Sequence, residues 1–539
     1  MASVSRPQTV ADVLVRRLGE HGVQHVFGYP GGQTTPIYDA LARTPGIRHV
    51  LARDEQAAAF MADGYARATG KPGVCLAVCG PGVLNAATPL ATAFTDSIPI
   101  LLLSGQVPSK GLGLRSGYYH ENDQLSLCAT ITKWRTRIAS APNLIPELDR
   151  AFTTMREGRP GPVFVETPLD VLRADFKGNP TAAVPPTPTP RTPSTKEVAA
   201  LVKLVGGWRQ PLLIVGGGAI IADAAPLVVQ LAERLGAPVF HSLSGKSAVP
   251  TDHPLNAGLP WSRATSDLTN MEQFMSPLFA QADGLLAIGC RFSQATTGSW
   301  CMPLPAALAQ IDVDGEEIGR HYPVTLGIQA DAKAAVQLLL SALPGASRLP
   351  WTAPCRPSIS ARLLGLDLIE GLRRGLPRDA IIAGDITRLT YQMLAEFPIY
   401  SPRTFLHPAG YVSMGYGLPA ALGAKAAFPE RVVATVVGDG CFMMSGLELA
   451  TAVQEKLPVI VILINDGSLT LIKAIQQRRY ESRFIGVDLR NPDFETYARA
   501  FGVRHWKIDS DSSLEIALRE AVASSAPALI EVQGQDEAG

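Results

Sequence analysis

The stretch RVVATVVGDGCFMMSGLELATAVQEKLPVIVILINDGS, residues 431–468, decides which fold class the sequence predicts. Residues 432–437 and 459–464 are apolar, largely β-branched runs of the length expected for buried parallel strands. Ser445 lies between them at a position suited to cap a helix, and Pro458 ends that helix before the second strand. The stretch therefore predicts a strand–helix–strand unit.

Each of these predicted strands is followed by an acidic turn that contains glycine. Gly438, Asp439 and Gly440 follow the first strand, and residues 465–467, Asn-Asp-Gly, follow the second. A right-handed βαβ unit places the carboxyl ends of its two strands side by side, where open α/β sheets bind ligands. Two carboxylates cannot bind a diphosphate themselves, but they can hold Mg²⁺, which joins carboxylates to phosphate oxygens. We interpret the stretch as a cation and diphosphate site; an ordinary βαβ unit with polar turns is the alternative.

Composition limits the class of protein. A chain of 539 residues corresponds to roughly three domains, and its 46% hydrophobic content supports large buried cores. Lys and Arg together number 48, as do Asp and Glu, so no global charge favours nucleic acid or an anionic membrane. The seven cysteines lack metal-ligand spacing, and no segment has the ~20 apolar residues of a membrane span. We expect a cytoplasmic protein with reduced thiols and with neither membrane nor nucleic-acid partners.

Two linkers divide the chain into three predicted domains. Residues 178–194 are too rich in proline for a helix or an interior strand, and residues 343–358 have a similar composition. The predicted domains are residues 1–177, 195–342 and 359–539. In each domain strand-like runs alternate with helical patterns, which predicts the α/β class with three doubly wound parallel sheets.

A glutamate begins a helical pattern in the first domain. In RDEQAAAFMADGYARATG, Glu55 shares one helix face with Ala58, Ala59 and Ala62. A carboxylate among alanines is expected to be withdrawn from water. An ordinary helix-start glutamate, stabilised by the helix dipole, is the alternative.

Other loops of the first two domains are candidate ligand contacts. Glycine-rich turns at residues 28–32 and 79–82 allow close approach of a ligand to the backbone. The segment GLGLRSGYYHEND, residues 111–123, predicts either a site wall or an exposed polar loop. The run GGGA from Gly216 is not the G-x-G-x-x-G fingerprint, and tight strand-to-helix packing is its favoured interpretation.

Across nearly its whole length the chain resembles the thiamine diphosphate (ThDP) enzymes of the acetolactate synthase and pyruvate oxidase group. The segments that carry the resemblance are FGYPGG, RDEQAAAFMADGYARATGKPGV, CGPGVLNAATPLATAFTDSIP and SMGYGLPAALGA. Asp439 and Asp466, 27 positions apart, match the GDG…NN metal motif of that family. The resemblance implies pyrimidine-binding, central and diphosphate-binding domains in that order. It also implies a homodimer or homotetramer with the active site at the subunit interface.

The resemblance also implies roles for individual residues. Glu55, from a neighbouring subunit, would protonate the aminopyrimidine, and Tyr119 and His120 would lie on the substrate side. Asp439, Asp466 and the main-chain carbonyl of Ser468 would bind Mg²⁺. Met414 would bend the cofactor, and the carbonyl of Val412 would accept a hydrogen bond from its amino group. The implied cofactor-binding residues are Gly28, Pro30, Pro81, Asn85, Asp385, Val412, Met414, Gly438, Asp439, Gly440, Cys441, Asp466, Ser468 and Leu469.

The implied activity is that of a ThDP- and Mg²⁺-dependent carboligase or lyase, similar to acetolactate synthase. Such an enzyme decarboxylates a 2-oxo acid such as pyruvate and transfers the remaining fragment to a second carbonyl compound. A non-oxidative 2-oxo acid decarboxylase or an acyl-CoA lyase of the oxalyl-CoA type is the alternative within the family. A catalytically silent regulatory or binding relative is the alternative from another class.

Several positions depart from the acetolactate synthase pattern. Asp466 stands in place of asparagine, Ala295 in place of the arginine that recognises the second oxo acid, and Ile475 in place of tryptophan. Tyr119 and His120 stand near the usual FQE segment. These differences argue against an authentic biosynthetic acetolactate synthase and favour another acceptor or simple decarboxylation.

Proton transfer and a flavin are the remaining open points. His120 and His407 are candidates for proton transfer because histidine exchanges protons near neutral pH, although each is as well suited to a hydrogen-bonding wall. Whether the protein binds FAD is left open, because Gly216–Gly218 and Arg291 are compatible with a flavin site. Residues 258–264, GLPWSRA, poorly resemble a flavin-contacting segment, which favours its absence.

Overall fold

The computed structural model describes residues 8–113, 117–177, 179, 183–263, 273–353 and 363–533. Several sequence predictions extend outside the described residues: positions 114–116 of the polar loop, part of each linker, and position 264 of the candidate flavin segment. No helix in the described part of the chain is long and apolar enough to cross a bilayer.

Three six-stranded parallel sheets form the framework, which confirms the predicted fold class. The first sheet has the order β2-β1-β3-β4-β6-β5 and consists of β1 (His25–Gly28), β2 (Arg48–Leu51), β3 (Gly73–Ala77), β4 (Ile100–Gln106), β5 (Trp134–Arg137) and β6 (Val163–Pro168). The second has the order β14-β13-β12-β7-β8-β9 and consists of β7 (Pro211–Val215), β8 (Val239–His241), β9 (Asn256–Gly258), β12 (Gly284–Ile288), β13 (Leu308–Asp312) and β14 (Leu326–Gln329). The third has the order β16-β15-β17-β18-β20-β19 and consists of β15 (Ile381–Gly384), β16 (Phe405–Leu406), β17 (Val433–Gly438), β18 (Val459–Asn465), β19 (Arg504–Ile508) and β20 (Ala528–Gln533).

Helices cover these sheets, and one small antiparallel pair, β10 (Trp261–Arg263) with β11 (Gln273–Met275), lies apart from them. The helices up to residue 173 are α1 (Val10–Glu20), α2 (Thr35–Arg43), α3 (Glu55–Thr69), α4 (Pro81–Asn85), α5 (Ala87–Asp96), α6 (Gln124–Leu127), α7 (Leu144–Arg156) and α8 (Leu169–Arg173). Those around the second sheet are α9 (Thr195–Gly206), α10 (Gly217–Ile221), α11 (Ala225–Leu235), α12 (Leu278–Gln281), α13 (Gln294–Thr297) and α14 (Ala332–Ala342). The remaining ones are α15 (Leu368–Gly375), α16 (Arg388–Glu396), α17 (Gly417–Ala427), α18 (Asp439–Ser445), α19 (Leu449–Gln454), α20 (Thr470–Arg479), α21 (Phe494–Ala500) and α22 (Asp511–Ser524).

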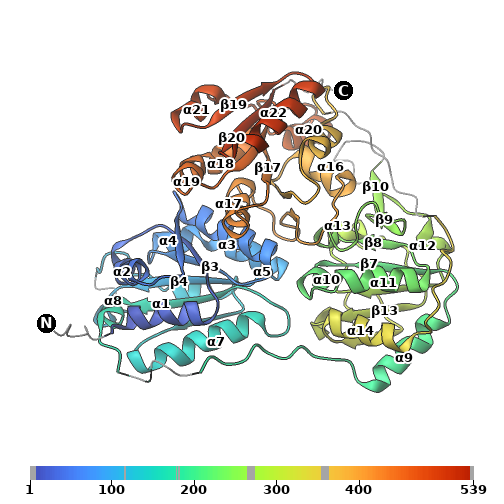
Figure 1. Cartoon of the computed structure of the whole chain (residues 1–539), viewed down its shortest axis with the longest axis horizontal. Coiled ribbons are helices and arrows are strands. Elements are labelled where there is room, and N and C mark those ends of the chain that lie inside the picture. Colours follow the sequence, from blue (N-terminus) through green and yellow to red (C-terminus); the bar gives the residue numbers. More distant parts are fainter. Residues whose placement is uncertain are drawn as a thin grey trace. The chain divides into compact units, whose positions relative to one another are not determined.

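The chain divides into two compact units. Unit 1 comprises Met1–Pro188, Tyr411–Glu430 and Met443–Val459, and unit 2 comprises Thr189–Gly410, Arg431–Phe442 and Ile460–Gly539. Within unit 1, α1 and α7 lie on one face of the first sheet and α3 on the other (Figure 1). The predicted domain boundaries at 177, 195, 342 and 359 stay predictions.

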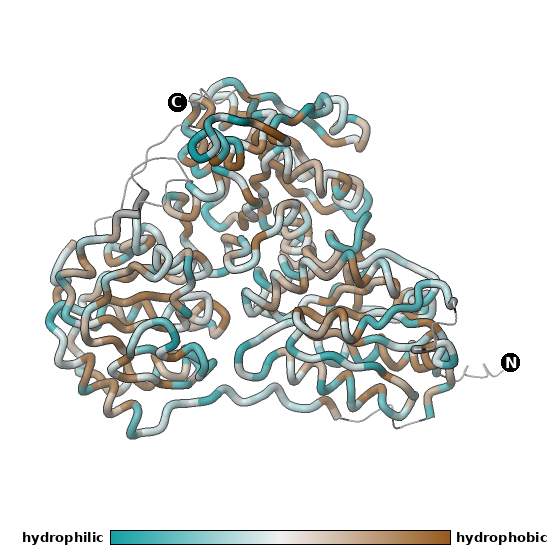
Figure 2. The backbone as a smooth tube through the Cα atoms, turned by 180° about the vertical axis from the view of Figure 1, so that it is seen from behind, coloured by the Kyte–Doolittle hydropathy of each residue, from teal (hydrophilic) through white to brown (hydrophobic). Residues whose placement is uncertain are grey.

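Alternating strand side chains build a core on each face of a sheet. In β7, Leu213 and Val215 pack with α11 and α14, whereas Leu212 and Ile214 pack on the other face with Phe279 of α12. This two-residue period is the normal consequence of strand geometry. Figure 2 shows the apolar segments running through the sheets, while residues 185–194 are neutral to polar and contain neither helix nor strand.

The helix after β17 begins earlier than the sequence predicts. Helix α18 starts at Asp439, directly at the strand end, and passes at Ser445 into a short 3-10 turn, Gly446–Glu448. Ser445 makes no capping hydrogen bond, and its buried hydroxyl has no partner among the described residues. The prediction of Ser445 as the helix cap was therefore wrong. An acidic residue in the first turn stabilises a helix that starts at Asp439, because the amino-terminal end of the dipole is positive.

Candidate active site

The two acidic turns predicted from the sequence meet at neighbouring strands of the third sheet, β17 and β18. The main-chain nitrogen of Gly467 donates a hydrogen bond to Oδ2 of Asp439 at 2.9 Å, and that of Gly440 donates to Oδ1 at 2.7 Å. Gly467 has a φ of 67°, a left-handed conformation that glycine adopts without strain. Asp439 is therefore held by the backbone of both turns.

Asp466 is held by residues that follow it in the second turn. Its Oδ1 accepts from the main-chain nitrogen of Ser468 at 3.2 Å, and its Oδ2 accepts from the hydroxyl of Thr470 at 2.6 Å. Ser468 and Leu469 are in turn tied to Val487, whose carbonyl accepts from the Ser468 hydroxyl at 3.2 Å and from Leu469 N at 2.7 Å. The predicted metal ligands Asp466 and Ser468 therefore lie in one ordered turn.

The electrostatics of this pair suit a hard cation. Burial raises the pKa of Asp439 above its ordinary value, against the hydrogen bonds that lower it. Burial also raises the pKa of Asp466, and the negative charge of Asp439 adds to that rise. A divalent cation between these carboxylates would offset both effects. The described residues contain no cluster of three His, Cys, Asp or Glu side chains, so Mg²⁺ here would take its other oxygen ligands from backbone, water and phosphate.

Asn491 completes this cluster, and sequence reasoning missed it. Its Nδ2 donates to Oδ2 of Asp439 at 2.7 Å and lies 3.0 Å from Oδ1 of Asn465. Asn491 is 52 positions from Asp439 in the chain. No local pattern marks it, because a loop asparagine is ordinary and only the fold places it beside the turns.

The other predicted contacts of unit 2 gather at the end of β15. Asp385 is fully buried, and its Oδ1 accepts from the main-chain nitrogen of Ile386 at 2.8 Å. The thiol of Cys441 donates to the carbonyl of Ile386 at 3.3 Å, which connects this turn to α18. His407 is also buried, with Nδ1 3.1 Å from the carbonyl of Gly384. This contact fits the wall role that the sequence left open for His407.

In unit 1, Glu55 lies against the loop that carries Pro81 and Asn85. Glu55 is the first residue of α3 and is 9% exposed, as the alanine-rich face predicts. Asn85 Nδ2 donates to Oε2 of Glu55 at 3.0 Å. A Cβ atom at Gly82 would lie 2.9 Å from Oε1 of Glu55, so only glycine fits there without displacing the carboxylate. The sheet topology has brought two segments 30 residues apart into contact.

Gly28 and Pro30 lie at the end of β1. A Cβ at Gly28 would lie 2.4 Å from the carbonyl oxygen of Leu76 and 2.8 Å from the hydroxyl of Tyr38, so this position requires glycine. Pro30 and the preceding Tyr29 are exposed. Gly28 is therefore closely packed against its neighbours, whereas Tyr29 and Pro30, which follow it, are exposed.

Tyr119 and His120 form a stacked pair next to the Gly80 turn. Their ring centroids are 3.9 Å apart, and Tyr119 is 78% exposed. His120 has a φ of 69°, a left-handed conformation that costs a non-glycine residue energy, and its Nδ1 is buried with no partner among the described residues. A Cβ at Gly80 would lie 3.0 Å from the carbonyl oxygen of His120.

Val412 and Met414 precede α17. Val412 is 46% exposed, and Gly415, with a φ of 85°, lets the chain pass close to α18. A Cβ at Gly415 would lie 3.2 Å from Cβ of Met444 and 3.9 Å from Nε2 of Gln56. The segment is thus held against the start of α3. The carbonyl and wedge roles of Val412 and Met414 stay predictions.

Close backbone packing accounts for the glycine run at residues 216–218. A Cβ at Gly216 would lie 2.0 Å from the carbonyl oxygen of Gly289, and one at Gly218 would lie 2.8 Å from Cα of Gly289. This close approach of backbone to backbone is the packing that the sequence favoured. Ala295 is exposed, and its carbonyl accepts from Nε1 of Trp261 at 2.9 Å. The absence of FAD stays a prediction.

Comparison with known proteins gives the class to which this fold and these clusters belong. Family models match all three parts of the chain: the N-terminal TPP binding domain of thiamine pyrophosphate enzymes at residues 8–127, the central domain at 198–339, and the C-terminal TPP binding domain at 384–532. The chain therefore belongs to the thiamine pyrophosphate (ThDP) enzyme family. The resemblance inferred from the sequence is confirmed.

Individual relatives divide between two activities. The "Probable 2-ketoarginine decarboxylase" of Pseudomonas aeruginosa is 37% identical over 97% of this chain and 94% of its own length. The "Probable acetolactate synthase large subunit" of Methanocaldococcus jannaschii is 35% identical over 97% of this chain and 91% of its own. A solved ThDP-dependent 4-hydroxybenzoylformate decarboxylase of Rhodococcus jostii RHA1 has 25% identity, a TM-score of 0.85, and coverage of 99% of this chain and 100% of its own.

Proposed function

We propose that the protein uses ThDP and Mg²⁺ to decarboxylate a 2-oxo acid and releases an aldehyde. Membership of the ThDP family supports the cofactor, and the decarboxylases among the relatives support the reaction. The observation that carries the proposal is His120, whose Nδ1 is buried without a partner in the described structure, beside the Gly80 turn. Simple decarboxylation needs a proton donor for the product carbon, and such a histidine is suited to that task.

The residues of the two clusters fit ThDP. When bound, the cofactor would supply a nucleophilic carbon and an electron sink for the decarboxylation. Asp439, Asp466 and the carbonyl of Ser468 would hold Mg²⁺ and through it the diphosphate, because their donors are hard oxygens. Glu55 would share a proton with the aminopyrimidine; its burial, with Asn85 donating to only one carboxylate oxygen, supports this role.

Transfer to a second carbonyl compound is the second candidate, which the sequence prediction placed first. The acetolactate synthase relatives support it. Ala295, which stands where the resemblance implies an acceptor-binding arginine, argues that any acceptor is not a second 2-oxo acid bound in the synthase manner. We further propose a homodimer or homotetramer in which Glu55 acts on ThDP held by the partner subunit.

A product analysis tests the proposal. The protein with ThDP and Mg²⁺ is incubated with a panel of 2-oxo acids, with and without added aldehydes, and products are identified by mass. We expect CO₂ and free aldehyde, and a loss of about 100-fold in rate for His120→Gln. His253→Gln, which removes an unrelated histidine paired with Glu233, serves as the control. Condensed hydroxyketones as the main products would instead support carboligation, and no CO₂ from any 2-oxo acid would overturn both candidates.

A further inference from the structure

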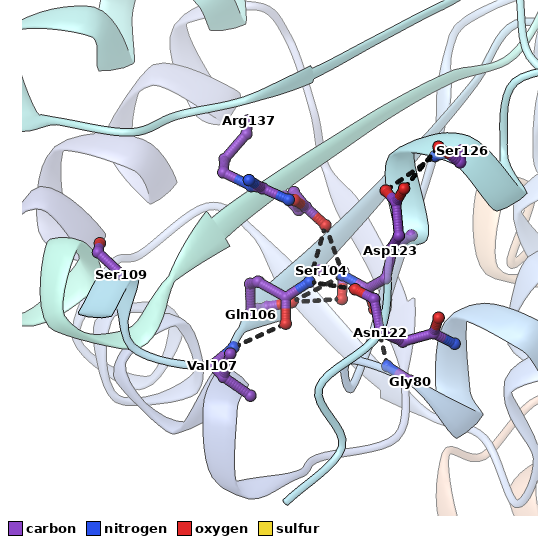
Figure 3. Close-up of polar contacts among 12 residues, drawn as sticks. Gly80, Ser104, Gln106, Val107, Ser109, Asn122, Asp123, Ser126 and Arg137 are labelled. Carbon is purple, nitrogen blue, oxygen red and sulfur yellow. Dashed lines mark hydrogen bonds and ion pairs between the residues drawn. The ribbon is translucent and has the colours of Figure 1, made fainter. Parts of the chain in front are cut away.

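A fully buried carboxylate lies beneath the loop that carries Tyr119 and His120. Glu166, on β6, has no exposed surface, and its Oε1 accepts from Nε of Arg137. Its Oε2 accepts from Nε2 of Gln124 at 2.6 Å and from Nε2 of Gln106 at 3.2 Å. Both glutamines are also fully buried. Figure 3 shows Gln106, Asn122 and Arg137 gathered in this network near Gly80.

The carboxylate determines which way each amide points. The carboxylate of Glu166, which is paired with Arg137, can act only as a hydrogen-bond acceptor. Gln124 and Gln106 must therefore turn their NH₂ groups toward it. Their carbonyl oxygens then face the opposite way. The oxygen of Gln124 accepts from the main-chain nitrogen of Gly80 at 2.7 Å, and that of Gln106 accepts from Val107 N at 2.8 Å. The amide orientations therefore follow from the charge of Glu166.

The same network also holds the loop that carries Tyr119 and His120, at Asn122. Gln106 Nε2 donates to the carbonyl of Asn122 at 3.0 Å, and the main-chain nitrogen of Gln124 donates to that carbonyl at 3.0 Å. Asn122 is two residues from His120, which has left-handed backbone, and His120 contacts the Gly80 turn. Gly80 directly precedes Pro81, the first residue of α4, whose last residue, Asn85, donates to Glu55.

We propose that Gln124, oriented by Glu166, is a positioning residue that sets the placement of His120 relative to the cofactor loop at Gly80–Asn85. Two hydrogen bonds connect Glu166 to Gly80 through the Gln124 amide. Its NH₂ group donates to Glu166, and its oxygen accepts from Gly80 N. Hydrogen bonds in such a buried chain reinforce one another, and a reversed amide would leave two buried groups unpaired. The part of this inference that concerns His120 rests on the proposed function. The expected effect of Gln124 on ThDP affinity is independent of that function.

The experiment uses the full-length protein with ThDP and Mg²⁺. In Gln124→Leu, Gly80 N loses its acceptor, and Oε2 of Glu166 loses the shorter of its two amide hydrogen bonds. We expect ThDP affinity, measured by calorimetry, to fall about ten-fold and kcat to fall about ten-fold, with KM changed less than three-fold. Ser126→Ala is the matched control, because it removes the hydroxyl hydrogen bond from the same short helix to Asp123 without touching Gly80 or Glu166. It should leave all three constants within two-fold.

A swapped pair separates orientation from general stability. In Gln124→Glu combined with Glu166→Gln, the new amide can donate to the new carboxylate, which still accepts from Gly80 N. Nε2 of Gln106 then loses its acceptor at position 166 but keeps the carbonyl of Asn122. We expect Gln124→Glu alone to resemble Gln124→Leu and the double variant to recover to within about three-fold of the parent. The inference is overturned if Gln124→Leu lowers only Tm, if Ser126→Ala has the same effect, or if a folded double variant recovers nothing. Should the parent decarboxylate no 2-oxo acid, the proposed function fails while the ThDP affinities still decide this inference.

Discussion

Asn85 donates a hydrogen bond from Nδ2 to Oε2 of Glu55 at 3.0 Å, which joins the end of α4 to the start of α3. The contact fixes one oxygen of a buried carboxylate and is made inside unit 1. An amide that donates to a carboxylate restrains its rotation without neutralising it. The pair therefore holds the carboxylate of Glu55 in a defined orientation.

Replacement of Glu55 should abolish most of the activity while leaving the cofactor site intact. Glu55→Gln keeps the shape of the side chain but cannot exchange a proton in the same way. We expect kcat to fall by at least about 100-fold, the range typical of lost acid–base catalysis, with ThDP affinity changed only a few-fold. Steady-state kinetics and calorimetry measure the two quantities. Asn85→Ala should cost less, because the carboxylate remains; equal losses in both variants would argue against a proton role for Glu55.

Removal of the divalent cation should release the cofactor. The buried carboxylate of Asp439 and the half-buried one of Asp466, at the ends of β17 and β18, repel a diphosphate unless a cation lies between them. We expect excess chelator to abolish ThDP binding and Mg²⁺ to restore it, as measured by calorimetry. Asp466→Asn removes one of the two charges and should retain several-fold more affinity in chelator than the parent.

Asp488→Asn is the control for the loss of a nearby surface charge, since Asp488 pairs with Lys473 and is exposed. It should behave like the parent in both conditions. Unchanged ThDP binding by the parent in chelator would contradict the metal assignment of Asp439 and Asp466.

Glu448 should make stability depend on pH. Its Oε1 accepts from the main-chain nitrogen of Arg53 at 2.9 Å, and Oε2 lies 2.6 Å from the hydroxyl of Thr451. The same hydroxyl lies 3.0 Å from the carbonyl oxygen of Leu51. Burial raises the pKa of Glu448 to about 7 against the hydrogen bonds from Thr451 and Arg53, which lower it, and the charge of Asp54 adds to the rise.

The sign of the effect follows from this rise. Below pH about 4.5 the carboxyl is protonated in both the folded and unfolded states, so the stabilisation is fully present. As pH rises through about 7, the folded protein must ionise a buried group, and up to about 3 kcal/mol is lost. Glu448→Gln mimics the protonated form. Scanning calorimetry at one scan rate should show its Tm rising relative to the parent between pH 5 and pH 8, and a pH-independent difference would contradict the prediction.

A methyl group at the α3–α17 contact should destabilise unit 1. A Cβ at Gly423 would lie 1.9 Å from the carbonyl oxygen of Met61, a distance that backbone cannot accommodate without moving. We expect Gly423→Ala to cost about 1–3 kcal/mol, or more if the helices separate. Gly206→Ala is the control because its added Cβ meets nothing within 4 Å. Thermal unfolding compares the two, and an equal Tm for both variants would disprove the packing explanation.

Local patterns predicted much of the fold because each strand and helix carries its own period. The strands at residues 432–437 and 459–464 were placed within one residue of β17 and β18, since buried parallel strands read as continuous apolar runs. Within the three six-stranded sheets, the strands that were not predicted are β5, β6, β9, β14, β16, β19 and β20. The start of α18 was misplaced because the acidic turn itself begins the helix, and the more familiar serine signal six residues later does not.

The sequence by itself determined the α/β class, the two acidic turns and Glu55 on an alanine-rich helix face, because these depend on residues near one another in the chain. Only the tertiary structure decided which distant groups complete them. Asn491 reaches Asp439, Glu448 holds the backbone beside Glu55, and Glu166 orients Gln124 toward Gly80. Each of these contacts involves a buried carboxylate that must find a partner, and the fold, rather than spacing along the chain, determines where that partner lies.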